Sequence, residues 1–555
     1  MLIPSHLIPT NMFADFFQSV YVPGDGSVLY NLSLLPQTNI NLCMIDINSD
    51  LVFDRLVDLD ISKGADFDKI PPIFLQNCSP TLSLPLSFIY QTSLNVGIFP
   101  AIWKLSIVTP LFKDGKRSDV SNYRPISGLS CIAKVLESIV TDRIFASFKN
   151  TISENQHGFF SGRSCQTNLC IYNEFISTAL DDALQVDSVY FDFKKAFDRV
   201  DHDILLQKLR FYGVCGSLLS WLDSYLRNRV QYVKFGQTLS KEITVYSGVP
   251  QGSHLGPVLF LIFVNDLSFV FEQCHYLFFA DDLKVFRRIT NENDCALLQS
   301  EVSNLYTWCR NNMTLNSDKC KVISFSRKRH PLDVVYQING APIHRVELIN
   351  DLGIIFDSGL RFISHIDNII AKGFKMAGFI MRQCWQFKNV EVLKTMYYAL
   401  VRSHLEYCCV VWAPLYQVHI KRLERVQSRF MNFLLYKLNI DRSMLSYSDR
   451  LSLLGLDSLD LRRSKLTLVF GHKILNNLMD CLDLLFLLNF RVPCRLTRQT
   501  NYFSVNQSRT DIGRNSPVNH IMNSFNQFLP HDFNIKCSTL TFKNKIRHFI
   551  DDRAV

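Results

Sequence analysis

Three aspartates at the ends of β-type segments constrain the fold of this chain more than any other feature. Asp192 ends the run SVYFDF (188–193), and Asp281 and Asp282 stand where YLFFA turns into LKVF. β-Branched and aromatic residues fill both runs, as in buried strands. If the strands are neighbours, three carboxylates meet at one sheet edge, where divalent cations offset their repulsion. The pattern therefore predicts an α+β core with an acidic edge suited to Mg²⁺ and phosphoryl transfer.

The context of the aspartate pair matters more than the pair itself. The chain also contains Asp181-Asp182 and Asp551-Asp552, so such a pair has little specificity and usually marks a solvated turn. Apolar residues flank Asp281 and Asp282 on both sides, which a solvated turn does not require. This flanking favours a functional site over a surface turn.

Composition excludes several classes of protein. A chain of 555 residues with 47% hydrophobic and 20% charged residues predicts two to four packed lobes and excludes a wholly disordered chain. The longest apolar run, 258–264, is far shorter than the roughly 20 residues of a membrane span. No basic region precedes the apolar residues of the N-terminus, so we expect no secretion signal, no membrane partner and a location in the nucleus or cytoplasm. The 16 cysteines lack zinc-site spacing and are expected to be reduced, mostly buried thiols.

Charge is distributed unevenly along the chain. Residues 1–100 carry 3 basic and 9 acidic side chains, a net charge of −6, whereas residues 361–440 carry 12 basic and 4 acidic side chains, a net charge of +8. The basic segment indicates a phosphate-bearing partner, with a solvated helix face as the alternative.

Apolar spacing predicts the remaining elements. Helices are expected within 66–104, over 202–212 and 218–227, after the loop 247–257, and through most of 361–438 and 449–477. Strands are expected over 230–235 and 243–246. The first 60 residues have weak periodicity and yield no predicted element.

Seven blocks in a fixed order extend the pattern around the aspartates. They are WKLSIVTPLFKDGKRSDVSNYRPIS (103–127), ENQHGFFSGRS (154–164), FDFKKAFDRVDHDILLQKL (191–209), SGVPQGSHLGPVLFLIFVNDL (247–267), FADD (279–282), LNSDKCKVISFS (315–326) and DLGIIFD (351–357). This series resembles the reverse transcriptase family, most closely the polymerase of jockey-like non-LTR retrotransposons.

The resemblance implies a right-hand polymerase that copies an RNA template from a DNA primer and dNTPs. It implies an N-terminal remnant or linker over 1–60, fingers and a palm with an antiparallel sheet over 61–360, an α-helical thumb over 361–440 and a helical C-terminal region over 441–555. The segment before residue 60 is too short for the endonuclease that complete elements carry, so we expect that enzyme to be absent or supplied separately in trans.

The resemblance also assigns roles near the metal ions. Asp192, Asp281, Asp282 and the backbone carbonyl of Phe193 would hold two Mg²⁺ ions, for which Mn²⁺ would substitute. In the segment NSDKCK, Lys319 resembles the lysine that protonates pyrophosphate, with Lys321 as the alternative.

Further residues would contact the nucleotide or the nucleic acids. Phe197 resembles the aromatic gate that selects dNTPs, with core packing as the alternative. The other expected nucleotide contacts are Lys113, Arg124 and Gln251. The expected nucleic-acid contacts are the loop residues Gly248, Pro250 and Gly252, the primer-grip turn Leu352-Gly353, and the helix face Arg422, Arg425 and Arg429, for which a solvated stripe is the alternative.

The sequence leaves three alternatives to this function. One is a catalytically silent nucleic-acid-binding remnant, which the intact aspartates, Gln251 and Arg124 oppose. The second is an RNA-dependent RNA polymerase, which Phe197 and FADD in place of GDD oppose. The third is a maturase-like protein of group II introns, to which the segments after residue 361 are less similar.

Overall fold

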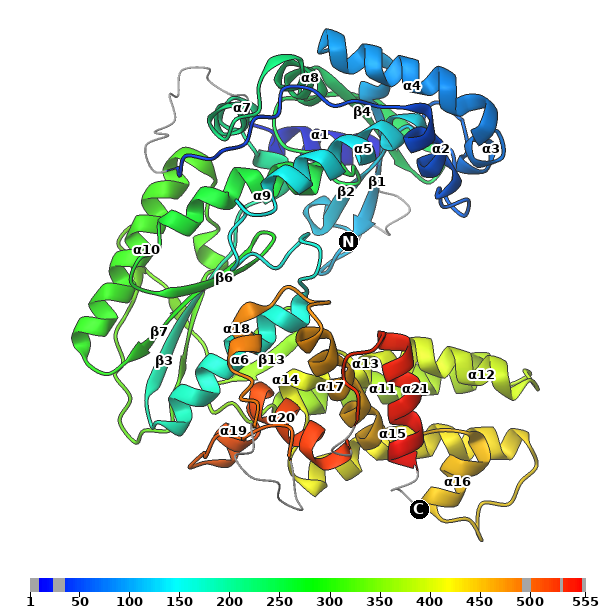
Figure 1. The fold of residues 1–555 in the computed structure, drawn as a ribbon, viewed down its shortest axis with the longest axis vertical. Coiled ribbons are helices and arrows are strands. Elements are labelled where there is room, and N and C mark those ends of the chain that lie inside the picture. The colour runs from blue at the N-terminus through cyan, green and yellow to red at the C-terminus, as the bar shows by residue number, and fades with distance from the viewer. Residues whose placement is uncertain (1–8, 23–34, 492–500, 530–532, 552–555) are drawn as a thin grey trace.

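The computed structural model describes residues 9–22, 35–491, 501–529 and 533–551. A four-stranded sheet with its helices forms one lobe, and a mainly helical C-terminal region forms another (Figure 1). A five-stranded sheet and helix α10 (Glu292–Asn312) join the two lobes on one side of the molecule (Figure 1). The predicted mixture of sheets and helices is confirmed.

The four-stranded sheet has the order β2-β1-β4-β5. Its strands are β1 (Leu105–Phe112), β2 (Tyr123–Gly128), β4 (Arg229–Phe235) and β5 (Thr238–Val245), which agrees with the strands predicted over 230–235 and 243–246. Helix α1 (Thr10–Val20) covers it by burying Phe13, whose ring centroid lies 4.9 Å from that of Tyr123. The sequence did not predict α1, because the apolar periodicity before residue 60 is weak.

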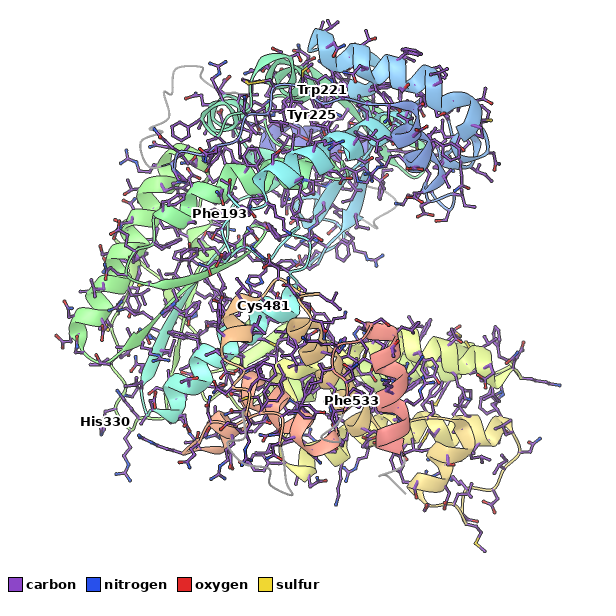
Figure 2. The ribbon with its side chains drawn as sticks, in the orientation of Figure 1. Phe193, Trp221, Tyr225, His330, Cys481 and Phe533 are labelled. Carbon is purple, nitrogen blue, oxygen red and sulfur yellow. A yellow bond between two sulfur atoms is a disulfide. The ribbon has the colours of Figure 1, made fainter. Side chains whose placement is uncertain are left out.

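A large apolar core joins the helices of this lobe to α10 and to strands of the five-stranded sheet. In it, the fully buried rings of Trp221 and Tyr225 stack with centroids 5.7 Å apart (Figure 2). The helices of the lobe are α2 (Ser49–Val57), α3 (Pro72–Asn77), α4 (Ser79–Val96), α5 (Cys131–Phe148), α7 (His202–Phe211), α8 (Gly216–Leu226) and α9 (Leu255–Val264). The helices predicted over 202–212 and 218–227 are confirmed, and the one predicted within 66–104 is divided at Cys78.

The five-stranded sheet has the order β11-β8-β3-β7-β6, with antiparallel pairs except between β11 and β8. Its strands are β3 (Gln185–Phe191), β6 (His275–Phe279), β7 (Asp282–Ile289), β8 (Lys321–Phe325) and β11 (His344–Arg345). The predicted strand at 188–193 and the predicted strand–turn–strand are both confirmed. Helix α6 (Cys165–Asp181) packs on this sheet through Tyr172, whose ring meets that of Phe286 edge-on at 5.0 Å.

Two short hairpins lie on either side of β11 along the chain. They are formed by β9 (Gln337–Ile338) with β10 (Ala341–Pro342), and by β12 (Leu348–Asp351) with β13 (Ile354–Asp357).

Helices dominate the chain after residue 361, as the apolar spacing predicts. They are α11 (Ile363–Gln383), α12 (Val390–Tyr397), α13 (Ser403–Glu406), α14 (Cys409–Trp412), α15 (Gln417–Lys437), α16 (Tyr447–Leu454), α17 (Leu459–Leu475), α18 (Leu482–Phe486), α19 (Asp511–Arg514), α20 (Pro517–Phe528) and α21 (Thr539–Asp551). A second apolar core links these helices to α6 and one face of the five-stranded sheet, and includes the labelled Phe533 (Figure 2). No helix of the described part of the chain is long and apolar enough to cross a membrane.

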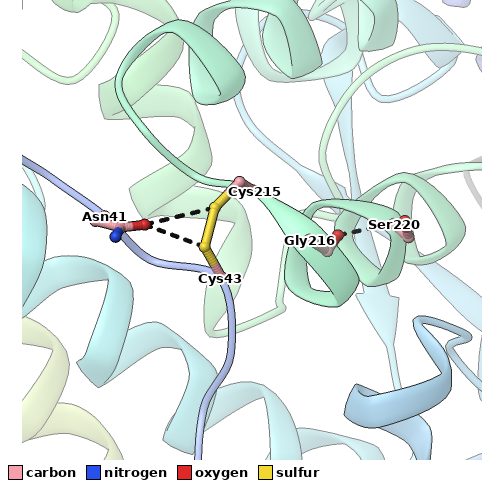
Figure 3. The surroundings of a disulfide bond; sticks show 5 residues. All are labelled: Asn41, Cys43, Cys215, Gly216 and Ser220. Carbon is pink, nitrogen blue, oxygen red and sulfur yellow. Dashed lines mark hydrogen bonds between the residues drawn. A yellow bond between two sulfur atoms is a disulfide. The ribbon is translucent and has the colours of Figure 1, made fainter.

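The expectation that all cysteines are reduced is wrong for Cys43 and Cys215, which form a disulfide across 172 positions of sequence (Figure 3). The backbone amide of Leu42 donates to the carbonyl of Gly213 at 3.0 Å. The backbone amide of Cys215 donates to the carbonyl of Leu42 at 3.0 Å. These backbone contacts bring the two cysteine Cα atoms to 4.5 Å, within the range that a disulfide spans. Spacing along the sequence could not show this pairing, because a tertiary contact creates it.

Candidate active site

Strand register brings the three aspartates to one edge of the five-stranded sheet. Phe191, the last residue of β3, pairs with Leu283 of β7, so Asp192 and Asp282 extend from neighbouring strands at the same edge. Asp281 lies in the two-residue turn between β6 and β7, since Phe279 pairs with Asp282. The prediction that these strands are neighbours is confirmed.

A buried glutamine supports the turn that carries Asp281. The side-chain oxygen of Gln156 accepts a hydrogen bond from the amide of Ala280 at 2.9 Å and another from the amide of Gly158 at 2.8 Å. Ala280 has a φ of 57°, which is uncommon for a residue with a side chain. Gln156 therefore holds the turn in place, a role that sequence analysis did not assign although the residue lies in the block ENQHGFF.

The carboxylates raise one another's proton affinity. Burial raises the pKa of Asp281, Asp192 raises it further, and Arg124 and Lys113 oppose the increase. Burial and the charge of Asp281 raise the pKa of Asp282 to about 6, with contributions from Asp351 and Asp192. Such mutual repulsion is expected where a cation would bind between carboxylates.

Four basic side chains lie near this acidic edge. Burial lowers the pKa of Lys195, Asp198 raises it, and Lys113, Lys319 and Arg124 lower it further. Because these charges act on one ammonium group, the basic residues predicted from two separate blocks, 103–127 and 315–326, share one region with Lys195. Lys195 was missed by sequence analysis, although it belongs to the block FDFKKAFD.

The segment before β8 fixes the position of Asp192. The side-chain amide of Asn316 donates to Asp192 Oδ2 at 2.8 Å, and its backbone amide donates to the Asp192 carbonyl at 2.7 Å. Lys319 Nζ lies 3.9 Å from Asp192 Oδ2. Lys319 and Lys321 both line the cleft beside Asp192 and Asp282, but among the described residues only Lys319 forms an ion pair with Asp192. Asn316 is a second residue that sequence analysis missed.

The aromatic residues after Asp192 differ in their surroundings. Phe193 is buried, with 7% of its surface exposed, at the upper end of the five-stranded sheet (Figure 2). Phe197 is half-buried, and its ring stacks on that of Phe260 in α9 with centroids 4.2 Å apart. Phe197 therefore has one packed face. This arrangement is compatible both with core packing and with a role as the gate.

The loop 248–252 lies against the backbone that follows β3. Gly248 has a φ of +88°, and a Cβ there would come within 2.7 Å of the backbone of Asp198. Gly252 has a φ of +123°, and a Cβ there would come within 2.5 Å of the Ser127 carbonyl oxygen. Both positions therefore require glycine. The intervening Pro250 lies in the same loop, and its carbonyl accepts from the Ser253 hydroxyl at 2.9 Å.

Gln251 is held by a buried aspartate. Its side-chain amide donates to Asp198 Oδ1 at 2.8 Å, and its backbone carbonyl accepts from the Ser127 amide at 2.8 Å. Burial raises the pKa of Asp198 to about 6, and the hydrogen bond from Gln251 opposes that increase. Sequence analysis did not assign Asp198 a role, although the residue directly follows Phe197.

The turn Leu352-Gly353 joins β12 to β13 at the rim of the same cleft, which has a volume of about 270 Å³. Both residues have positive φ angles, 46° and 90°, and the Tyr407 hydroxyl donates to the Leu352 carbonyl at 3.0 Å. Leu352 lines the cleft together with Asp192 and Asp282. The structure therefore brings this predicted turn close to the aspartates.

The three arginines predicted along one helix face are not equivalent. All lie on α15, but Arg422 donates to Asp367 Oδ1 of α11 at 2.5 Å and is paired. Arg429 lies over the ring of Phe374, with its guanidinium carbon 5.8 Å from the ring centroid, and Arg425 is exposed. Arg425 and Arg429 are thus more available than Arg422 to a nucleic-acid backbone.

The acidic edge has the oxygen ligands that Mg²⁺ prefers. Within the described ranges, no three His, Cys, Asp or Glu side chains converge closely enough to hold a metal ion. The three aspartates nevertheless share an edge, and burial together with neighbouring carboxylates raises the pKa of Asp281 and of Asp282. The carboxylate oxygens of the three aspartates are therefore the kind of ligand that a divalent cation takes.

Comparison with known proteins gives consistent matches. Residues 113–379 match the family model of reverse transcriptase (RNA-dependent DNA polymerase). The chain is 30% identical over 373 residues to the probable RNA-directed DNA polymerase from transposon X-element of Drosophila melanogaster, covering 63% of this chain and 40% of that protein. It is 29% identical over 297 residues to the RNA-directed DNA polymerase from mobile element jockey of the same organism, covering 51% of this chain and 32% of that protein.

The chain spans less than half the length of either relative. The matched family region contains all three aspartates, the loop 248–252 and the turn Leu352-Gly353. Reverse transcriptases in general use divalent metal ions. Residues 113–379 therefore match a reverse transcriptase domain, and the part of the chain that contains them is similar to RNA-directed DNA polymerases of non-LTR retrotransposons.

Proposed function

We propose that this chain is an RNA-directed DNA polymerase that adds dNTPs to a primer 3′-hydroxyl on an RNA template. One observation carries the proposal: the register of β3 and β7 places Asp192, Asp281 and Asp282 at one sheet edge inside the family-matched region. Basic side chains act on the same edge, as expected where a triphosphate approaches carboxylates.

The three aspartates and the Phe193 carbonyl would hold two Mg²⁺ ions. When bound, such ions lower the pKa of the primer hydroxyl and stabilise the charge that develops on the leaving pyrophosphate. Asn316 orients the Asp192 carboxylate, and Gln156 orients the turn that carries Asp281. Lys319, beside Asp192, is the stronger candidate for donating a proton to pyrophosphate.

The nucleotide would approach from the side of the four-stranded sheet. Arg124 belongs to β2 and Lys113 directly follows β1, so both extend from that sheet toward Asp281. Phe197, fixed on its packed face by Phe260, would exclude a 2′-hydroxyl with its other face. Gln251, tied to Asp198, would contact the nucleotide from the adjoining loop.

The lobes correspond to the parts of a right-hand polymerase in this proposal. Residues 61–360 would form the fingers and palm, residues 361–440 the thumb and residues 441–555 a helical C-terminal region, with residues 1–60 as an N-terminal segment. Gly248, Pro250, Gly252, Leu352 and Gly353 would contact the template and primer, while the exposed arginines of α15 would contact backbone phosphates.

Primer extension tests the proposal directly. The purified chain, a DNA primer annealed to a heteropolymeric RNA template, dNTPs and Mg²⁺ should give template-dependent products. Asp281→Ala under the same conditions should give none and should still bind the hybrid. RNA binding without extension in the wild-type chain would contradict the proposal and favour a catalytically silent remnant. Extension with rNTPs in preference to dNTPs would favour an RNA polymerase.

A further inference from the structure

A cavity of about 590 Å³ lies where five separate segments of the chain meet. Helix α6 contacts both helix α14 and the short helix α19 there (Figure 1). The volume falls within the range of about 300–1,000 Å³ that is typical of ligand sites. No residue that lines this cavity also lines the cleft beside Asp192 and Asp282, so the two are separate sites.

Hydrogen bonds fix the walls of the cavity relative to one another. Asp181 at the end of α6 accepts from the Thr510 amide at 2.7 Å. The Asn173 side chain donates to the Val411 carbonyl at 2.8 Å, and the Asn515 side chain donates to that of Ala413 at 3.1 Å. The cavity is therefore preformed, and a ligand would not have to order its walls.

The rim of the cavity is strongly basic. Arg327, Arg361 and Arg509 line it, and Asp511 is the one acidic residue of the lining. Within the described ranges, the guanidinium groups of these arginines form no ion pair closer than 4.0 Å, whereas Asp511 already accepts from Tyr416 and pairs with Arg514. The arginines are therefore available to an anionic ligand.

An aromatic side chain stands among these charges. Tyr416 is 58% exposed, and its hydroxyl donates to Asp511 Oδ2 at 2.9 Å. That hydrogen bond raises the pKa of Tyr416, while the charges of Arg327 and Arg361 lower it, so both guanidinium groups lie near the phenol. Apolar side chains such as Trp412 form the floor. Base-stacking aromatic surface, an apolar floor and phosphate-binding arginines are the elements of a nucleotide site.

We infer that this cavity binds a nucleotide of single-stranded RNA, with its base against Tyr416 and its phosphates on Arg327, Arg361 and Arg509. The inference rests on the proposed function, since an enzyme that copies RNA needs to hold the unpaired part of its template. The site would retain that RNA while the cleft is occupied by the primer–template hybrid. Free mononucleotides share the same chemistry, and the test below separates the two sources.

The test uses the full chain with its cleft saturated by a blunt-ended DNA–RNA hybrid, which has no unpaired template that could fill the cavity. A fluorescent 4-thiouridine RNA oligonucleotide is then photocrosslinked, and the modified peptide is identified by mass spectrometry. We expect crosslinks to the segment 412–419. The triple variant Arg327→Ala, Arg361→Ala, Arg509→Ala should lower RNA affinity about 10-fold at moderate salt, as loss of several phosphate contacts predicts. Its Arg→Lys counterpart should recover part of that loss, because the charge remains.

Matched controls separate this site from general basic charge. Arg210, Arg310 and Arg442 are exposed and line neither the cavity nor the cleft, so their combined replacement by alanine should leave the crosslink unchanged. Extension of a saturating primer–template should stay within about twofold in the cavity variant.

Three results would overturn the inference. One is the absence of crosslinks at 412–419 in a wild-type chain that extends primers. Another is a loss of RNA affinity in the control variant as large as the loss in the cavity variant. The third is that free UMP competes for the site as effectively as RNA of equal nucleotide concentration. Failure of the wild-type chain to extend primers at all would instead count against the proposed polymerase function, so the two failures are distinguishable.

Discussion

The edge of the five-stranded sheet and the cavity beside α14 concentrate opposite charges and differ in what they can do. At the sheet edge, buried carboxylates raise one another's pKa beside four basic side chains. In the cavity, three arginines and an exposed tyrosine surround an apolar floor. The sheet edge is suited to metal-assisted phosphoryl transfer, and the cavity is suited to binding the phosphate backbone of RNA. Variants of the two regions should therefore fail in different ways.

The largest expected effect is on catalysis at the sheet edge. Asp192→Ala or Asp281→Ala should lower the rate of primer extension by about 10²-fold or more, because each removes charge stabilisation needed in the transition state. Binding of the hybrid, measured by fluorescence anisotropy, should change little. Asp182→Ala is the matched control, since this exposed aspartate belongs to a pair outside the site. Extension within twofold of wild type in either site variant would contradict the assignment.

A second effect concerns stability around the loop 248–252. Glu137 of α5 is fully buried and accepts from the His254 amide at 3.2 Å, and burial raises its pKa to about 7. Because the folded state binds this proton more tightly than the unfolded state, stability should fall as pH rises from about 4.5 to 7. Glu137→Gln should remove the share of that fall that belongs to Glu137, on the order of 2–3 kcal/mol, in urea unfolding at several pH values, while Asp198 and Asp282 keep theirs.

The exposed Glu154 provides a control for the pH series. Glu154→Gln should keep the wild-type decline between pH 4.5 and 7. Parallel stability profiles for Glu137→Gln and the wild-type chain would show that Glu137 titrates as it does in the unfolded state.

A third, smaller effect concerns sugar selection. Phe197→Val should raise the ratio of kcat/KM for rNTPs over dNTPs about tenfold, because a smaller side chain leaves space for a 2′-hydroxyl. Phe260→Leu, which changes only the packed face of Phe197, should lower stability and leave the ratio nearly unchanged. An unchanged ratio in Phe197→Val would assign Phe197 to core packing.

The smallest effect concerns the helix face of α15. Replacing Arg425 and Arg429 together should make the slope of log K against log salt shallower by about 1.4–1.8, as two lost phosphate contacts predict. Arg422→Ala should change the slope less, because Asp367 already pairs with Arg422. Equal slopes for the double variant and the wild-type chain would identify the stripe as a solvated face.

The sequence predicted those features that depend on residues close together along the chain. The strand before Asp192 and the hairpin carrying Asp281 and Asp282 follow from local runs of β-branched and aromatic residues, and the structure contains both. Their shared edge follows from antiparallel pairing of β3 with β7. The basic residues of separate blocks also gather there, near Lys195.

Features built by tertiary contacts were not predictable in this way. The disulfide between Cys43 and Cys215 depends on the backbone contact of Leu42 with the segment before α8. Asn316 gains its role only because the segment before β8 lies beside Asp192. The cavity joins residues from 173 to 515, so no local pattern could indicate it.

The single-turnover rate of extension at saturating primer–RNA template, measured in parallel for Asp281→Ala and for the triple arginine variant of the cavity, separates chemistry from RNA binding. We expect a loss of about 10²-fold or more in the first variant. We expect a rate within about twofold of wild type in the second, whose defect should appear only in binding of single-stranded RNA. Similar rates for Asp281→Ala and the wild-type chain, or equal losses in both variants, would contradict the separation of chemistry from RNA binding.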